Sequence, residues 1–158
     1  METAKRERLS RSVTETEQLG ERLGAALHGG ELICLAGELG AGKTAFTRGI
    51  GRGWGAAEPI TSPTFTLIHE HHRTSDRQTL YHVDGYRLSG AADAWTVGLD
   101  ELLHGEGVVV IEWPENVADA LPQERLWMTL DFVDDQTRQL TFQANGAWAV
   151  ALLAALED

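Results

Sequence analysis

The chain has 158 residues, of which 42% are apolar, and this length predicts one domain around a single hydrophobic core. No stretch approaches the roughly 20 consecutive apolar residues of a membrane helix, and no apolar stretch follows the charged N-terminus. We therefore expect a soluble, cytoplasmic protein without a signal peptide. The single cysteine excludes an intrachain disulfide. The formal charge of −11 repels polyphosphates, so we expect no direct nucleic-acid binding by this chain alone.

The N-terminal part of the chain is predicted to change from a tail to a helix near residue 13. Residues 1–12 are polar and lack apolar periodicity, which predicts a mobile tail before a single domain at 13–158. Thr14 and Glu17 have the spacing of a capping box, and apolar residues at helical spacing follow until Gly29.

The middle of the chain has the order of elements found in α/β domains. Residues 32–36 form a short apolar run, typical of a strand buried on both faces of a parallel sheet. A helix is expected from about Gly42 until the glycines at 51, 53 and 55. Further strands are expected at 64–69, 80–83, 108–111, 125–132 and 138–143, and helical segments at 92–103, 114–120 and 148–156. The pattern predicts a three-layer α/β fold with a mixed, mainly parallel sheet and antiparallel additions.

The segment GELGAGKT, residues 37–44, matches the phosphate-loop pattern GxxxxGK[ST]. Its glycines free the backbone to point amide groups at phosphate oxygens, near the positive end of the following helix. Lys43 would neutralise the β- and γ-phosphates of ATP, and the Thr44 hydroxyl would ligate Mg²⁺. The alternative is a glycine-rich connection without a ligand. The expected nucleotide-binding residues are Gly37, Glu38, Leu39, Gly40, Ala41, Gly42, Lys43, Thr44 and Ala45.

Two carboxylates at strand ends are candidates for holding the metal or positioning water. Glu112 ends the apolar run VVVI, and Asp84 ends the strand-like LYHV. Glu112 could also be a strand-end charge that meets solvent, and Asp84 could be a turn residue, since Asp-Gly is a turn dipeptide. Trp113 could cover the site or belong to the core.

The polar segment around Pro63 lies where NTPases place a loop that senses the γ-phosphate, although an ordinary Ser-Pro turn fits equally. Four histidines, His69, His71, His72 and His82, suggest a metal cluster only superficially, because they lack partners at convincing ligand spacing.

Five segments in this order resemble one bacterial family. They are GELGAGKTAFTRGIGRGWG, ITSPTFTLIHEH, YHVDGYRL, VVVIEWPE and LDFVDDQTRQLTF. Together they are similar to TsaE, the P-loop ATPase of tRNA threonylcarbamoyladenosine biosynthesis. The resemblance implies a P-loop NTPase fold, ATP and Mg²⁺ as cofactors, and action with the threonylcarbamoyl transferase TsaD and its companion TsaB.

The resemblance also implies roles for single residues. Ser62 and Thr64 would belong to a switch-like loop, with Thr64 among the catalytic residues beside Lys43, Glu112 and Asp84. Thr44, Glu112 and Asp84 would form the metal site, whereas Thr16 and Arg138 are expected near the nucleotide. Two departures from the family pattern are Gly85, which could loosen Asp84, and the alanine-rich segment 89–94, which could alter partner contact.

Two other functions share the phosphate loop. A small-molecule kinase needs an acceptor pocket and usually an arginine-rich lid, which the sequence does not show. A nucleotide-dependent binding module would use ATP only to set its conformation, without useful turnover.

Overall fold

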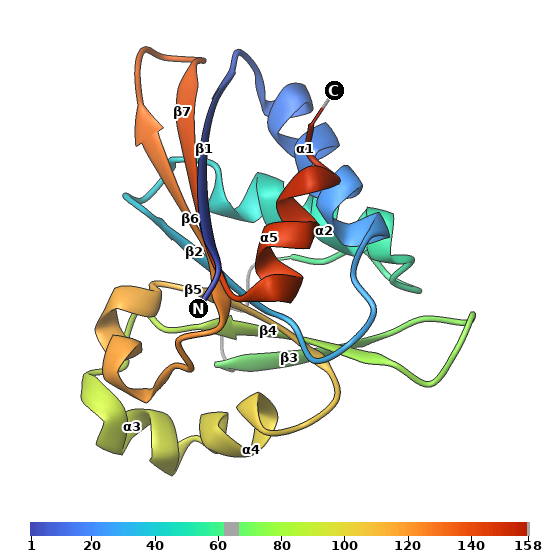
Figure 1. Ribbon diagram of the computed structural model, residues 1–158, viewed down its shortest axis with the longest axis vertical. Coiled ribbons are helices and arrows are strands. Elements are labelled where there is room, and N and C mark those ends of the chain that lie inside the picture. Colours follow the sequence, from blue (N-terminus) through green and yellow to red (C-terminus); the bar gives the residue numbers. More distant parts are fainter. Residues whose placement is uncertain (62–66, 158) are drawn as a thin grey trace.

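The computed structural model describes residues 1–61 and 67–157, which form a mixed sheet between two layers of helices (Figure 1). Within these residues the sheet has seven strands in the order β1-β7-β6-β2-β5-β4-β3. The strands are β1 Thr3–Ser10, β2 Leu32–Gly37, β3 Ile68–His72, β4 Thr79–Asp84, β5 Val108–Glu112, β6 Arg125–Phe132 and β7 Arg138–Asn145. The helices are α1 Val13–Ala25, α2 Lys43–Trp54, α3 Gly90–Thr96, α4 Leu99–Leu103, the 3-10 segment η1 Pro114–Ala120 and α5 Ala147–Ala154.

The four central strands, β6, β2, β5 and β4, run parallel, and antiparallel strands flank them on both sides. Side chains alternate between the faces of a strand, so the apolar run of β2 supplies both cores. Ile33 and Leu35 join the core under α1, α2 and α5, while Leu32 and Cys34 face α3, α4 and η1. The predicted three-layer, mainly parallel fold is confirmed.

The prediction of a mobile tail at 1–12 is wrong, because most of this segment is the edge strand β1. All eight residues of β1 pair antiparallel with β7. The strand is largely exposed, so it carries no apolar pattern, and its stability comes from backbone hydrogen bonds to a segment far away in the sequence. Only its last residue, Ser10, is buried.

Helix α1 begins two residues earlier than the predicted capping box. Ser12 is the N-cap, and its side chain accepts a hydrogen bond from the backbone N–H of Glu15 at 3.1 Å. Glu17, the expected partner of Thr14, instead pairs with Arg48 of α2 at 2.9 Å. The same Ser/Thr-x-x-Glu spacing thus occurs twice, and the earlier copy caps the helix.

The glycines at 51 and 53 do not end α2, which continues to Trp54 and stops at Gly55. Gly49 and Gly53 face α1, and a Cβ atom on either would collide with the backbone carbonyl oxygen of Glu17 or Glu21. Gly20 and Gly24 make the reciprocal close approach from α1 to α2. These glycines let the two backbones approach closely, and thereby fix the position of the helix that carries Lys43.

The predicted helix at 92–103 consists of two short helices, α3 and α4. Gly98 separates them with a φ of +83°, a conformation that suits glycine. The alanine-rich segment 89–94, which departs from the family pattern, forms the start of α3. This helix packs against η1.

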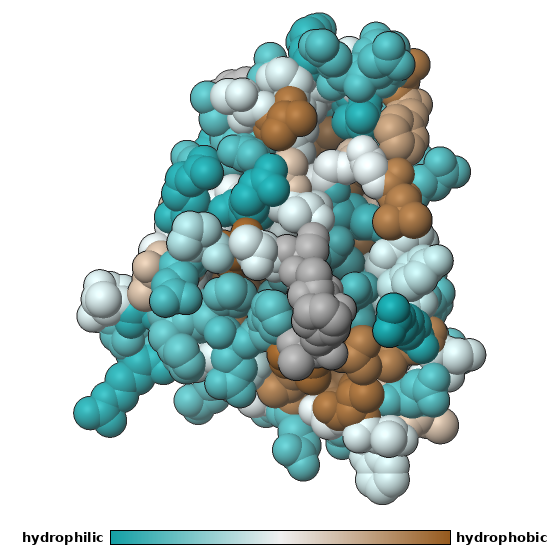
Figure 2. All heavy atoms as spheres, turned by 180° about the vertical axis from the view of Figure 1, so that it is seen from behind, coloured by the Kyte–Doolittle hydropathy of each residue, from teal (hydrophilic) through white to brown (hydrophobic). Residues whose placement is uncertain are grey.

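Much of the surface is hydrophilic, as the negative charge leads one to expect. Figure 2 shows the back of the molecule as mainly hydrophilic, with hydrophobic side chains gathered in its lower part, at the level of α3 and α4. No helix within residues 1–61 and 67–157 has the length and apolar character needed to cross a membrane.

Candidate functional site

The phosphate-loop segment lies at the carboxyl end of β2, a strand paired on both sides with parallel neighbours. The loop leaves the sheet at Gly37, which ends β2, and enters α2 at Lys43. Gly37, Gly40 and Gly42 have φ values of +148°, +81° and +107°, a region that side chains disfavour. The N–H of Ala41 donates to the Glu38 carbonyl at 3.1 Å and closes a turn. The predicted sequence of strand, glycine loop and helix is confirmed.

Lys43 begins α2 and is almost completely buried, with 5% of its surface exposed. Its ammonium donates to the carbonyl oxygen of Gly37 and lies 3.5 Å from the centroid of the Trp113 ring. Burial lowers the pKa of Lys43, while the carboxylates of Glu112, Glu115 and Asp84 act in the opposite direction. The loop therefore holds one cation among nearby carboxylates.

Asp84 and Glu112 lie side by side, as the carboxyl ends of parallel strands require. They are paired residues in the register of β4 and β5. Both line a cavity of about 380 Å³ together with Leu39, Gly40, Gly42, Lys43, Thr44, Tyr86 and Trp113. Carboxylate and hydroxyl oxygens are the ligands that Mg²⁺ prefers, so Asp84, Glu112 and Thr44 fit a magnesium site. The structure thus brings both candidate acids together with the loop.

Trp113 is the non-glycine residue with positive φ in the described chain, at φ +58° and ψ +47°. This left-handed conformation costs free energy for an aromatic residue and turns the chain sharply after β5. The indole faces Lys43 and contacts the Tyr86 ring edge-on, with 5.1 Å between centroids. Of the two alternatives for Trp113, the structure favours the one in which it covers the site.

The segment after Asp84 is held firmly, so the expected loosening by Gly85 is not supported. The Gly85 N–H donates to the Glu112 carbonyl at 2.8 Å, and the Tyr86 N–H donates to Asp84 Oδ1 at 3.0 Å. The Asn116 side chain also donates to the carbonyls of Gly85 and Tyr86. A Cβ atom at Gly85 would lie 2.8 Å from the Glu112 carbonyl oxygen, so this close approach suits glycine.

One known protein family matches most of the chain. The model of the family described as "Threonylcarbamoyl adenosine biosynthesis protein TsaE" matches residues 10–140. The chain belongs to the TsaE family. The matched span contains the phosphate loop and both candidate acids.

Individual TsaE proteins are similar over most of their length. The chain is 43% identical over 133 residues to the tRNA threonylcarbamoyladenosine biosynthesis protein TsaE of Treponema pallidum (strain Nichols), covering 84% of this chain and 96% of the relative. It is 41% identical over 145 residues to the TsaE of Streptomyces coelicolor, covering 88% and 97%. The solved structure titled "Crystal structure of Bacillus subtilus YdiB" superposes with a TM-score of 0.77 at 35% identity, covering 99% of this chain and 96% of that one.

In this TsaE family member, a second cavity of about 340 Å³ lies between the phosphate loop, the start of α1 and the turn that joins β6 and β7. It shares Gly40 and Gly42 with the first cavity, and Thr16 and Arg138 both line it. Arg138 donates to the carbonyls of Asp134 and Thr137, and Thr16 Oγ1 lies 2.7 Å from Ser10 Oγ. The sequence did not indicate the other polar and charged lining residues, Ser12, Asp135 and Gln136. These three residues belong to no sequence motif that indicates catalysis or binding.

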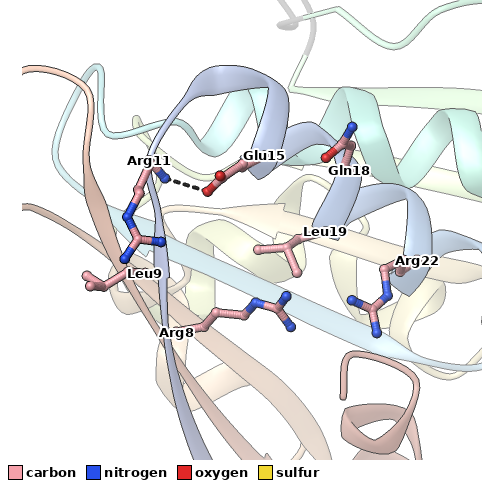
Figure 3. A pocket seen from close by; sticks show the side chains of 7 residues that line it. All are labelled: Arg8, Leu9, Arg11, Glu15, Gln18, Leu19 and Arg22. Carbon is pink, nitrogen blue, oxygen red and sulfur yellow. Dashed lines mark hydrogen bonds between the residues drawn. The ribbon is translucent and has the colours of Figure 1, made fainter. Parts of the chain in front are cut away.

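A further cavity, of about 620 Å³, lies between β1 and α1, and no phosphate-loop residue lines it (Figure 3). Three arginines line it, but two of them donate to the C-terminal backbone. Arg8 bonds the Leu156 carbonyl at 2.7 Å, and Arg22 bonds the Glu157 carbonyl at 2.6 Å. These two bonds help to hold the C-terminal residues in place. None of the site residues predicted from the sequence lines this cavity.

Ser62 and Thr64 lie outside the described residues, so their predicted role stays a prediction. Within the described ranges, His, Cys, Asp and Glu form no group of three that could hold a metal. His82 contacts Glu112 through its ring, an interaction that sequence reasoning missed. It stands two positions before Asp84 in a strand, and this spacing alone places both side chains on one face.

Proposed function

We propose that the chain binds Mg-ATP and hydrolyses it in support of tRNA threonylcarbamoyladenosine biosynthesis. The observation that carries the proposal is the placement of Lys43, Asp84 and Glu112 around one cavity at the mouth of a glycine loop. Membership of the TsaE family supports the pathway, because the relatives are named for this biosynthesis.

The binding step follows from the loop. Amide groups around Gly40 and Gly42, at the positive end of α2, favour an anion, and the Lys43 ammonium adds a full charge. For the triphosphate to bind, its oxygens must replace the Gly37 carbonyl as acceptors for Lys43. The base would then enter the cavity lined by Thr16 and Arg138, on the far side of Gly40 and Gly42.

The chemical step needs a water molecule in line with the γ-phosphate. Thr44, Asp84 and Glu112 would hold Mg²⁺, which when bound withdraws charge from the phosphate oxygens. Glu112 would orient the attacking water by accepting a hydrogen bond from it. Water adds to the γ-phosphorus as the bond to the β,γ-bridging oxygen breaks, giving ADP and phosphate. Trp113 and Tyr86, which line the same cavity, would limit the access of further water.

We further propose that turnover depends on TsaD and TsaB and that this subunit acts in the cytoplasm without binding tRNA directly. The chain is acidic overall, at −11, which disfavours direct contact with a phosphate backbone. Phosphate release measured with and without TsaD and TsaB tests the dependence. Equal rates with and without these partners would contradict it.

The binding step is tested by calorimetry with Mg-ATP. Replacing Lys43 by Ala should weaken binding by at least about tenfold, since a charge-assisted contact contributes roughly 1.5–3 kcal/mol. Lys5→Ala is the matched control, because Lys5 is the other lysine of the chain, lies exposed on β1 and pairs with Glu7. Equal heats for the wild type and Lys43→Ala would overturn the proposal, and transfer of the γ-phosphate to a metabolite would favour a kinase. Tight binding without any turnover, even with the partners present, would favour a binding module.

A further inference from the structure

His82 is a completely buried imidazole in the middle of β4. Its paired residues are His69 on β3 and Val110 on β5. Because side chains alternate along strands, His82 shares a face with Asp84, and Val110 shares the same face with Glu112. The imidazole therefore lies on the same face of the sheet as Asp84 and Glu112, two residues before the strand ends that line the cavity.

The imidazole contacts Glu112. His82 Nε2 lies 2.5 Å from Glu112 Oε2, and the Glu112 side chain is only 10% exposed. An ionised carboxylate only accepts hydrogen bonds, so the imidazole donates. Because His82 binds Oε2, Oε1 is the oxygen left for a ligand in the cavity.

The other ring nitrogen, Nδ1, is buried and has no hydrogen-bond partner among the described residues. An unsatisfied buried polar atom costs free energy, which an apolar side chain in the same place would avoid. The contact with Glu112 is thus the polar interaction of the ring that offsets this cost. Packing alone does not account for a histidine at this position.

We propose that His82 is a positioning residue that holds the Glu112 carboxylate in the orientation required for ATP hydrolysis, an inference that rests on the function proposed for the cavity. Imidazole and carboxylate act as a buried pair. His82 itself does not line the cavity and touches no substrate. Removing the imidazole should free Glu112 to rotate and leave nucleotide binding through the loop intact.

The inference is tested with two replacements of His82, one without and one with an N–H group that can donate to Glu112. His82→Leu removes the donor, and His82→Gln places an amide N–H at about the reach of Nε2. His82→Leu should lower the single-turnover hydrolysis rate by at least about tenfold, as is typical when the outer partner of a ligand is lost, with little change in ATP affinity. His82→Gln should restore most of the rate, and circular dichroism checks that both variants fold.

A double-mutant cycle separates positioning from packing. In a Glu112→Gln background, His82→Leu should cause almost no further loss, because the group that it orients has already been changed. His71→Leu is the control, since His71 also has a buried ring nitrogen without a partner among the described residues, but lies on the edge strand β3, which does not pair with the strand of Glu112. Equal losses from His82→Leu in both backgrounds, or failure of His82→Gln to restore the rate, would overturn the inference.

A readout without ATP keeps this inference separate from the proposed function. Nitrogen–proton NMR of the ligand-free protein should show a protected, downfield His82 Nε2–H resonance that shifts on Glu112→Gln and not on His71→Leu. If the wild type neither binds nor hydrolyses ATP, the proposed function fails while this spectrum still decides the pairing. Absence of the resonance, or no shift on Glu112→Gln, would refute the pairing.

Discussion

Glu112→Gln is expected to slow phosphate release by about 100-fold or more, in the range usual for loss of a positioned acid–base group, while Mg-ATP still binds. The amide keeps the size of the side chain and removes its charge. The loop, Lys43 and the positive end of α2 remain, and the glutamine amide still offers an oxygen to Mg²⁺. Mg-ATP affinity should therefore fall much less than the rate. The rate is measured in a single turnover with TsaD and TsaB present, and binding is measured by calorimetry.

Glu115→Gln is the matched control for this charge change. Glu115 also acts on Lys43 electrostatically, yet it is exposed on η1 and does not line the cavity. Its replacement should alter the rate by no more than about threefold, since an exposed charge pair contributes little. Equal loss of rate in both variants would mean that general electrostatics, rather than a placed carboxylate, accounts for the effect of Glu112.

The central part of the fold could be predicted because its signals are local. The apolar runs of β2 and β5 are buried on both faces, so each is uninterrupted, and turn residues mark its ends. The phosphate loop follows one run directly, and Glu112 ends the other. Parallel strands present their carboxyl ends at one edge, so the placement of Glu112 near Lys43 followed from strand order alone.

The errors come from contacts between distant segments. Strand β1 has no buried stripe, and only the edge of β7 makes it a strand. Gly53 reads as a helix breaker in isolation, but in α2 it allows the backbone of α1 to approach. His82 has no motif of its own, and its partner Glu112 is 30 residues away in the sequence. Local patterns could not supply these pairings.

Gly53→Ala is expected to destabilise the protein by about 3 kcal/mol, at the upper end of the usual cost of overpacking. Alanine favours an isolated helix by about 1 kcal/mol over glycine, so helix propensity predicts the opposite sign. The clash decides, because the new Cβ would meet the backbone carbonyl of Glu21, which no rotamer change can move. Urea denaturation of both proteins measures the difference.

Gly105→Ala is the control, since Gly105 lies outside the helices and its Cβ would find the nearest atom at 3.4 Å, in ordinary contact. Its stability should differ from the wild type by less than about 0.5 kcal/mol. Because α2 begins at Lys43, parting the helices should also displace the phosphate loop, so the Gly53→Ala protein should bind Mg-ATP more weakly. Saturating nucleotide should then recover part of the lost stability by mass action. A Gly53→Ala protein as stable as Gly105→Ala would show that α1 and α2 do not approach this closely in solution.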